Sequence, residues 1–228
     1  MRVRRAEAAL GLRQRSAIDV APLLGLRLRT ARLELRLPSE EEIVELVSLS
    51  ERGVHAPEEM PFRVPWTDLV GRERVDAALA HHGAARDDWR PESWSLVLCV
   101  FVDGRPAGAQ DVRGREFAVC REFETGSWLG REYQGLGYGT EMREAVLAFG
   151  FEGLGAVAAI SGAFDFNTAS LRVSEKLGYE LVGETTFAPR GVPQRELVMR
   201  LTRGEWERRR HPAVEVDGLE PCLPLFGL

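Results

Sequence analysis

One stretch constrains this chain more than any other, because strand, loop and helix signals follow one another within it. A predicted strand ends at Leu129, and a loop follows that contains Gly135, Gly137 and Gly139. A helix comes next, since apolar residues recur at helical spacing from 142 to 149. Glycines accept positive φ angles and let a ligand approach the backbone closely. The N–H groups of the loop and of the helix N-terminus would then face one spot, which predicts a site for a pyrophosphate.

The spacing of these glycines separates the loop from two better-known phosphate-binding motifs. It is GxGxG rather than the GxGxxG of dinucleotide-binding folds, and it follows antiparallel strands rather than an opening βαβ unit. The chain contains no GxxxxGKS or GxxxxGKT, which excludes a nucleotide-binding P-loop. Taken alone, the loop is also compatible with a tight connection between a strand and a helix.

The other elements alternate between strand and helix signals. Residues 26–37 alternate like a strand, and Ser39 with Glu42 forms a capping box for a helix that runs to about Glu51. Thr67 can cap a second helix, and a hairpin follows with its turn at residues 103–104. Strands are expected at 93–102, 105–112, 117–120, 122–129, 155–161, 179–186 and 195–201, and further helices at 141–152 and 169–177.

Composition limits the partners and the compartment. The chain of 228 residues carries a net charge of −5, which gives no argument for binding nucleic acid or an anionic membrane. Its three cysteines, Cys99, Cys120 and Cys222, are scattered, as is typical of a reducing compartment. No apolar run reaches the roughly 20 residues of a membrane-spanning helix, and residues 1–16 lack the apolar core of a signal peptide. We therefore expect a cytoplasmic protein.

The two ends of the chain differ from its middle. Residues 1–23 are basic and show little periodicity, so they are expected to form an N-terminal extension before a domain at 24–210. Residues 211–228 form a C-terminal extension that is apolar at Leu223, Leu225 and Phe226, so it is expected to dock. The tail can either cross a dimer interface or cover the chain's own sheet, which leaves a homodimer or higher homo-oligomer open. The single lysine, Lys176, among 30 basic residues indicates a GC-rich and therefore bacterial genome.

Two motifs carry a resemblance to a known family. Residues 134–139, Gln-Gly-Leu-Gly-Tyr-Gly, resemble the Q/R-x-x-G-x-G/A pattern that holds the CoA pyrophosphate in the GCN5-related N-acetyltransferase (GNAT) family. Residues 166–179 resemble the D-N-x-A-S…E-K-x-G-F segment of that family, with Phe166 in place of the usual aspartate. The order of elements is most similar to the RimJ/RimL-like branch. Residues 53–66, 126–142 and 216–227 also resemble an actinobacterial subgroup that includes enzymes using succinyl-CoA.

The resemblance implies a fold and a co-substrate. The fold is an α/β (α+β) GNAT fold, with a mixed, mostly antiparallel sheet of about seven strands and helices on both faces. Its central strands splay to admit acyl-CoA, either acetyl-CoA or succinyl-CoA, and no metal takes part. The residues expected to bind CoA are Trp128, Leu129, Arg131, Gln134, Gly135, Leu136, Gly137, Tyr138, Gly139, Thr140, Asn167 and Ser170.

An N-acyltransferase must deprotonate its amine, so a base is expected near the thioester. Glu124, on the strand 122–129, is the candidate base, although it also fits an ordinary exposed carboxylate. Ser170 matches the family position that returns a proton to the CoA sulfur, and it also fits a simple helix-capping role. The resemblance implies that backbone N–H groups at about Ser127–Leu129 hydrogen-bond to the carbonyl oxygen of the thioester. Cys120 has no His or Asp at a useful spacing, which argues against an acyl-enzyme.

The acyl and acceptor pockets are less constrained. A succinyl group needs a cation or polar donors, for which His55, Arg63, Gln110 and Ser127 are the candidates, although Gln110 also fits a surface residue. The proline-rich segment 53–66 fits either a loop over the pocket or a plain packed loop. The acceptor is left open among a protein N-terminus, a lysine and a small-molecule amine. An alternative function is a degenerate domain that binds acyl-CoA and regulates a partner without turnover.

Overall fold

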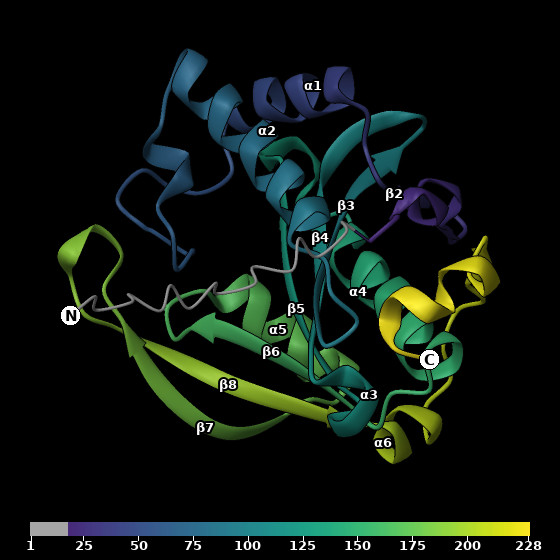
Figure 1. Ribbon diagram of the computed structural model, residues 1–228. Coiled ribbons are helices and arrows are strands. Elements are labelled where there is room, and N and C mark those ends of the chain that lie inside the picture. Colours follow the sequence, from purple (N-terminus) through teal and green to yellow (C-terminus); the bar gives the residue numbers. More distant parts are fainter. Residues whose placement is uncertain (1–17) are drawn as a thin grey trace, which may run out of the picture.

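A sheet of nine strands runs through the molecule in the computed structural model, which describes residues 18–228 (Figure 1). The strand order is β7-β8-β6-β5-β4-β3-β2-β1-β9, and within the described residues β5 and β6 form the one parallel pair. The strands are β1 (Arg27–Arg29), β2 (Leu33–Arg36), β3 (Ser93–Val102), β4 (Arg105–Arg115), β5 (Glu122–Leu129), β6 (Ala158–Phe164), β7 (Glu180–Phe187), β8 (Gln194–Thr202) and β9 (Glu215–Asp217). The helices are α1 (Glu40–Glu51), α2 (Gly71–Asp87), α3 (Phe117–Cys120), α4 (Tyr138–Ala148), α5 (Thr168–Leu177) and α6 (Arg203–Glu207).

The mixed, mostly antiparallel sheet expected from the sequence is confirmed, but it has nine strands where about seven were expected. The segment 26–37 divides into β1 and β2 around a turn in which Thr30 N donates to Leu33 O. The tail adds β9, which pairs with β1 at the sheet edge. A strand of three residues is too short to show an alternating pattern, so only its pairing with a distant partner reveals it.

The strand expected at residues 117–120 is wrong, because this segment is the short helix α3. Glu116 and Arg121 on either side of it both have positive φ angles, 48° and 53°, which turn the chain at each end. Phe117 is buried against Trp94, whereas Val119 is exposed. A short apolar run does not distinguish a strand from a helix, and here the packing of Phe117 decides.

Helix α1 has the boundaries that its capping signals predict. Ser39 accepts a hydrogen bond from Glu42 N, and the Glu42 carboxylate accepts one from Ser39 N, so both halves of the capping box form. Its apolar side buries Leu46 and Leu49 against the sheet. Helix α2 differs from expectation: it begins at Gly71 without a side-chain cap, and Thr67 lies in a preceding 3-10 turn.

Helix α4 covers the opposite face of the sheet from α1 (Figure 1). It begins at Tyr138, earlier than the apolar pattern alone predicts, and the apolar side chains Met142, Ala145 and Val146 are buried. A π-helical turn, Phe149–Gly153, follows α4 directly. Gly150 lies there against the ring of Phe123, where a Cβ atom would stand 2.3 Å from the ring.

The C-terminal tail, in yellow, lies beside the purple N-terminal end of the described chain (Figure 1). A 3-10 helix, Glu220–Phe226, places Phe226 against Trp89, Trp94 and Phe149 in the main core. Trp89 Nε1 donates a hydrogen bond to Leu225 O at 2.8 Å. At the other end, residues 1–17 of the expected N-terminal extension lie outside the described residues, while Leu23 is fully buried.

Candidate active site

The sheet opens between its two central strands. β5 and β6 pair from Glu122 and Ala158 as far as Thr125 and Ser161. Beyond that point β5 continues along β4, and β6 continues along β8. Figure 1 shows the result, since β6, β7 and β8 run at a steep angle to β3, β4 and β5. We call this opening, between residues 126–129 of β5 and 162–164 of β6, the β5/β6 split.

The split exposes unpaired backbone. Along a strand, alternate N–H and C=O groups point to opposite neighbours. Residues 126–129 pair only with β4 within the described part of the chain, so half of their backbone groups face the split. An extended ligand can therefore pair with this edge of β5.

The glycine loop lies at the open end of β5 and leads into α4. Gly135 and Gly137 have φ angles of 74° and 89°, which L-residues rarely adopt. Gly137 is the N-cap of α4 and provides no side chain to satisfy the first N–H groups of the helix. A Cβ atom at Gly137 would lie 3.3 Å from a guanidinium nitrogen of Arg32. The residues present therefore fit an anion such as a pyrophosphate.

Arg32, which the sequence did not single out, is the cation beside this helix N-terminus. Its guanidinium donates to Leu136 O at 3.1 Å and lies 4.5 Å from the centre of the Tyr138 ring. Glu141 anchors it through an ion pair of 2.5 Å, and the same carboxylate accepts a hydrogen bond from Thr30. The Arg32 side chain is half-exposed, so it can still meet an anion.

Arg131 and Gln134 serve the loop in a different way. The Arg131 guanidinium donates to His55 O at 2.7 Å, and the Gln134 amide donates to Val54 O at 2.7 Å and to Leu129 O at 2.8 Å. Both side chains thereby tie the glycine loop to the start of the segment 53–66. The positive charge of Arg131 is engaged with that segment, whereas Arg32 lies at the helix N-terminus.

Helix α5 brings the second motif next to α4. The Asn167 side chain caps α5 by accepting a hydrogen bond from Ser170 N at 3.2 Å. Val173 of α5 lies 3.8 Å from a Cβ atom built at Gly139, so the N-terminal turn of α4 packs against the middle of α5. Asn167 and Ser170 are both partly exposed on this side of the split.

Glu124 lies on the α1 side of the sheet, just before the split. Its carboxylate forms an ion pair with Arg63 at 2.9 Å and is about one-third exposed (32%). Arg63 also donates two hydrogen bonds, at 2.8 and 2.7 Å, to Glu196 of β8, whose carboxylate is buried. Gly162 leaves room for this pair, because a Cβ atom there would stand 2.8 Å from the Glu196 carboxyl carbon. Arg63 therefore spans the split with two carboxylates already around it.

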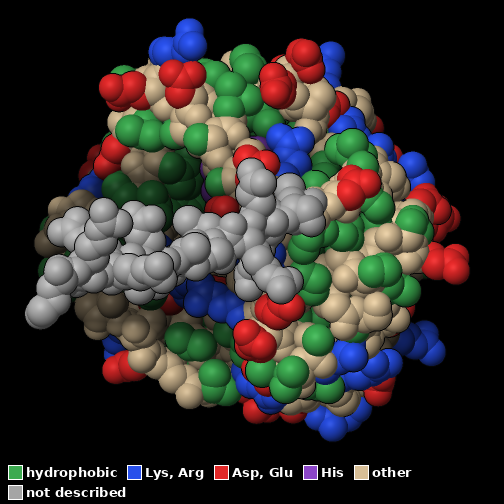
Figure 2. Space-filling view, viewed as in Figure 1, with side chains coloured by type: hydrophobic (Ala, Val, Ile, Leu, Met, Phe, Trp, Pro, Cys, Tyr) green, Lys and Arg blue, Asp and Glu red, His purple; other side chains and the backbone are tan. Residues whose placement is uncertain are grey.

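An aromatic row extends from the segment 53–66 to β5. His55 contacts Phe62, Phe62 contacts Trp66, and Trp66 contacts Trp128, with ring centres 5.2 to 5.6 Å apart. The two ring nitrogens of His55 hydrogen-bond to Ala56 O and to Thr67 Oγ1, both at 2.8 Å. Figure 2 shows hydrophobic side chains gathered in a recess on the left of the view, where this segment lies.

The α4 side of the split carries a buried polar cluster. Gln110 is fully buried, and its amide donates to Gly126 O at 2.9 Å and to Asp111 O at 3.1 Å. Ser127, which pairs with Gln110 across the strands, receives a hydrogen bond from Arg143 of α4. Gln110 therefore lies under α4, and the interpretation of it as a surface residue is wrong.

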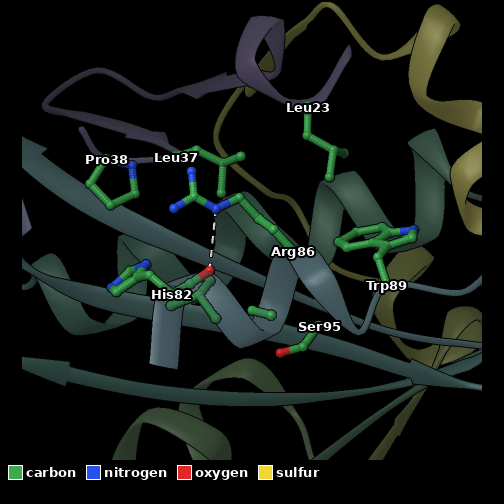
Figure 3. Close-up of a pocket in the computed structure, with 9 residues that line it drawn as sticks. Leu23, Leu37, Pro38, His82, Arg86, Trp89 and Ser95 are labelled. Atoms are coloured by element: carbon green, nitrogen blue, oxygen red, sulfur yellow. Dashed lines mark hydrogen bonds between the residues drawn. The ribbon is translucent and has the colours of Figure 1, made fainter. Parts of the chain in front are cut away.

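A small cavity near the C-terminal half of α2 lies apart from the split. Leu23, Leu37, His82 and Trp89 are among the residues that line it, and Arg86 Nε donates to His82 O at 3.3 Å (Figure 3). Its volume of about 10 Å³ holds a single water at most. Within residues 18–228 we find no group of three His, Cys, Asp or Glu arranged to hold a metal ion. None of the helices in that range is long and apolar enough to span a bilayer.

Sequence reasoning missed Arg32, Arg143 and Glu196. Arg32 and Glu196 belong to local patterns that look like ordinary exposed strand ends. Arg143 left a weak signal, because it stands on the apolar side of α4, one turn before the buried residues Val146 and Leu147. All three acquire their surroundings from residues far away in the chain.

Comparison with known proteins agrees with this geometry. The family model for the acetyltransferase (GNAT) domain matches residues 32–180. Among solved structures, RimJ of Mycobacterium smegmatis in complex with CoA-disulfide aligns with a TM-score of 0.67 at 16% identity, over 84% of this chain and 92% of that one. A GNAT-family acetyltransferase from Bacillus anthracis aligns with a TM-score of 0.61 at 18% identity, over 78% of this chain and 99% of that one.

A third structure is RimL, a ribosomal L7/L12 α-N-protein acetyltransferase in complex with coenzyme A. It aligns with a TM-score of 0.61 at 16% identity, over 76% of this chain and 95% of that one. At these identities the structural likeness shows the fold alone. The family model covers most of the chain, and the resemblance read from residues 134–139 and 166–179 is thereby confirmed. The chain belongs to the GNAT acetyltransferase family, and RimJ and RimL are among its structural neighbours.

Proposed function

We propose that this chain transfers an acyl group from acyl-CoA to a primary amine by direct attack. The observation that carries the proposal is the β5/β6 split, which opens beside the uncapped N-terminus of α4. An anion site and an unpaired strand edge thus lie together, which suits a long ligand with a pyrophosphate at one end.

The chain's own residues divide the work of binding. The loop at Gly135 and Gly137, with the N-terminus of α4 and the guanidinium of Arg32, would hold the pyrophosphate. The edge of β5 from 126 to 129 would pair with the pantetheine chain, and Asn167 with Ser170 would border it. Acyl-CoA supplies the activated acyl carbon as a thioester.

In the transfer step a new C–N bond forms and the C–S bond of the thioester breaks. Glu124 accepts the proton of the amine, directly or through a water, once Arg63 has shifted toward Glu196. Backbone N–H groups around Ser127 stabilise the negative charge on the carbonyl oxygen. Ser170 passes a proton to the departing sulfur and takes one back from solvent, to which Glu124 releases the amine proton. The products are an amide and the CoA thiol, and both residues return to their starting states.

The donor is acetyl-CoA or succinyl-CoA, and the acceptor is a protein N-terminus, a lysine or a small-molecule amine. RimL, a structural neighbour, is an α-N-protein acetyltransferase, which makes a peptide N-terminus the first acceptor to try. The decisive assay mixes the protein with each donor and an acceptor peptide, and follows thiol release together with the mass of the peptide. Acyl mass gained in step with thiol released supports the proposal, and the absence of both contradicts it.

Glu124→Gln is expected to lower kcat by about 100- to 1,000-fold, because the amine then loses its base. The Kd for CoA should stay unchanged, since Glu124 lies on the other side of the sheet from α4. Glu122→Gln is the matched control: it lies on the same side of β5 but is paired with Arg200, before the split opens. Equal losses in the two variants would remove Glu124 from the mechanism.

A second candidate function is favoured by one observation, the ion pair that occupies Glu124. In this version the domain binds acyl-CoA and regulates a partner without turnover. Calorimetric binding of CoA without thiol release, for any amine tested, would support it. Measured turnover would exclude it.

A further inference from the structure

Arg143 lies where β5 and β6 part. Its side chain extends from α4 toward the sheet and only 3% of the residue is exposed. One terminal nitrogen donates to Ser161 Oγ of β6 at 2.9 Å, and the other donates to Ser127 Oγ of β5 at 3.3 Å. Ser161 belongs to the last β5–β6 pair, and Ser127 lies two residues beyond it along β5. The guanidinium therefore sits under the β5/β6 split on its α4 side.

The charge of this guanidinium is not compensated by the residues that surround it. Within residues 18–228 no carboxylate forms an ion pair with it, and its hydrogen-bond partners are neutral hydroxyls. Its Nε is buried without a hydrogen-bond partner. A buried charge without a counter-ion is costly, and proteins pair such charges or place them where a ligand completes them.

A second buried arginine in the same chain shows what a structural role looks like. Arg74 of α2 is 8% exposed and also has no carboxylate partner in the described part of the molecule. All three of its nitrogens nevertheless donate: Nε to Leu69 O at 2.6 Å, one terminal nitrogen to Ser50 Oγ and the other to Thr67 O. Arg143 lacks such carbonyl partners and keeps a free donor.

Tyr179 adds a third neutral hydroxyl beside Arg143. Its hydroxyl is buried, and the side chains of Arg143 and Thr125 lie close enough to hydrogen-bond with it. Burial raises the pKa of this phenol, so the hydroxyl keeps its proton. The hydroxyls around Arg143 are all neutral, so its charge and its unpartnered Nε remain beneath the split, where a carboxylate would satisfy both.

We propose that Arg143 binds the terminal carboxylate of a dicarboxylic acyl chain of about succinyl length, an inference that rests on the proposed acyltransferase function. The amine and Glu124 approach from the α1 side, so an acyl chain held at β5 extends toward α4. An acetyl group would leave the charge of Arg143 unpaired, whereas a succinyl group brings its counter-ion. Arg63, the cation expected for this role, already has Glu124 and Glu196 as partners. The distal carboxylate takes no part in the C–N and C–S bond changes.

The first test uses the unaltered protein. Calorimetric titrations compare succinyl-CoA with butyryl-CoA, which has the same chain length and no distal charge, and with acetyl-CoA. Succinyl-CoA is expected to bind about 10- to 100-fold more tightly than butyryl-CoA, as a charged hydrogen-bonded pair is worth. Equal affinities would overturn the inference.

The second test uses variants. Arg143→Met keeps the length of the side chain without its charge and should abolish the preference for succinyl-CoA, while Arg143→Lys should keep part of it. Arg74→Met is the matched control and should keep the whole preference. If Arg143→Met loses affinity for succinyl-CoA and for butyryl-CoA to the same extent, Arg143 has a structural role instead. If Arg143→Met does not fold, the inference is tested by the preference for succinyl-CoA over butyryl-CoA in the unaltered protein and in Arg143→Lys.

Thiol release, measured in the same samples, separates the two proposals. Tight binding of succinyl-CoA without thiol release for any amine would contradict the proposed acyltransferase function. It would still support a carboxylate site at Arg143. Release at equal kcat/KM from succinyl-CoA and butyryl-CoA would leave the enzyme standing and remove the role of Arg143.

Discussion

His81 and His82 are neighbours on α2, yet their side chains have different surroundings. His81 is exposed, whereas His82 points under the helix and is 7% exposed. Burial lowers the pKa of His82 from 6.5 to about 4, and the nearby charges of His81 and Arg86 act in the same direction. The folded protein therefore holds His82 in its neutral form.

This burial makes stability depend on pH. Between pH 6.5 and about pH 4 the unfolded chain binds a proton at His82 that the folded chain does not, so the free energy of unfolding falls as the pH falls. The loss should reach about 3 kcal/mol near pH 4 and grow no further below it. Urea unfolding at several pH values measures the loss, and His82→Gln should flatten that slope. An unchanged slope in the variant would assign the acid sensitivity to other groups.

At the scale of single residues, the same reasoning separates Arg143 from Arg74. Both are buried arginines, and the difference lies in whether every donor has a partner. The local sequence shows neither the burial of these arginines nor their partners, because Ser161, the partner of Arg143, and Thr67, a partner of Arg74, come from other elements.

At the scale of elements, the glycine loop and α4 form one unit. Gly137 is the residue on which the helix start depends, because it is the N-cap of α4 and adopts a φ of 89°. A side chain at this position meets Arg32 as well as the backbone strain of a positive φ.

Gly137→Ala is therefore expected to weaken CoA binding by about tenfold or more, since the strain of 1 to 2 kcal/mol falls on the binding loop. Gly104→Ala is the control: Gly104 has a φ of 75° in the β3–β4 hairpin, and a Cβ atom there meets nothing within 4 Å. Both variants should lose similar stability by urea unfolding, but only Gly137→Ala should lose CoA affinity by calorimetry. If both keep that affinity, the pyrophosphate binds elsewhere.

At the scale of the whole molecule, the C-terminal tail completes the core. Phe226 lies among three aromatic rings from β3, the π-helical turn after α4 and the residues after α2, and Cys222 and Leu225 are buried near it. Their inward packing favours a tail that covers its own chain over one that crosses a dimer interface.

Phe226→Ala is expected to lower the free energy of unfolding by about 3 to 5 kcal/mol, because it leaves a cavity between rigid aromatic neighbours. Leu228→Ala, in the same tail at 37% exposure, should cost far less. Thermal and urea unfolding of the two variants measures the difference. Equal and small losses would show that the tail is dispensable for the core.

Local patterns in the sequence determined a large part of this structure. The capping box at Ser39 and Glu42, the hairpin at 103–104 and the glycine loop before α4 each depend on a few consecutive residues. Backbone geometry and capping are short-range effects, so they can be read without knowing the fold. The mixed sheet and the family were expected from the resemblance of residues 134–139 and 166–179 to GNAT motifs, and the match to the family model confirms that expectation.

The tertiary structure alone decided what surrounds each charge. Arg63 meets Glu196 across 133 positions of sequence, Arg32 meets Glu141 across 109, and Arg143 meets hydroxyls of two separate strands. It also decided that Phe117 begins a helix and that the tail supplies a ninth strand. These outcomes depend on contacts between distant residues. The pKa of an ionisable group also depends on its burial, which no local sequence pattern records.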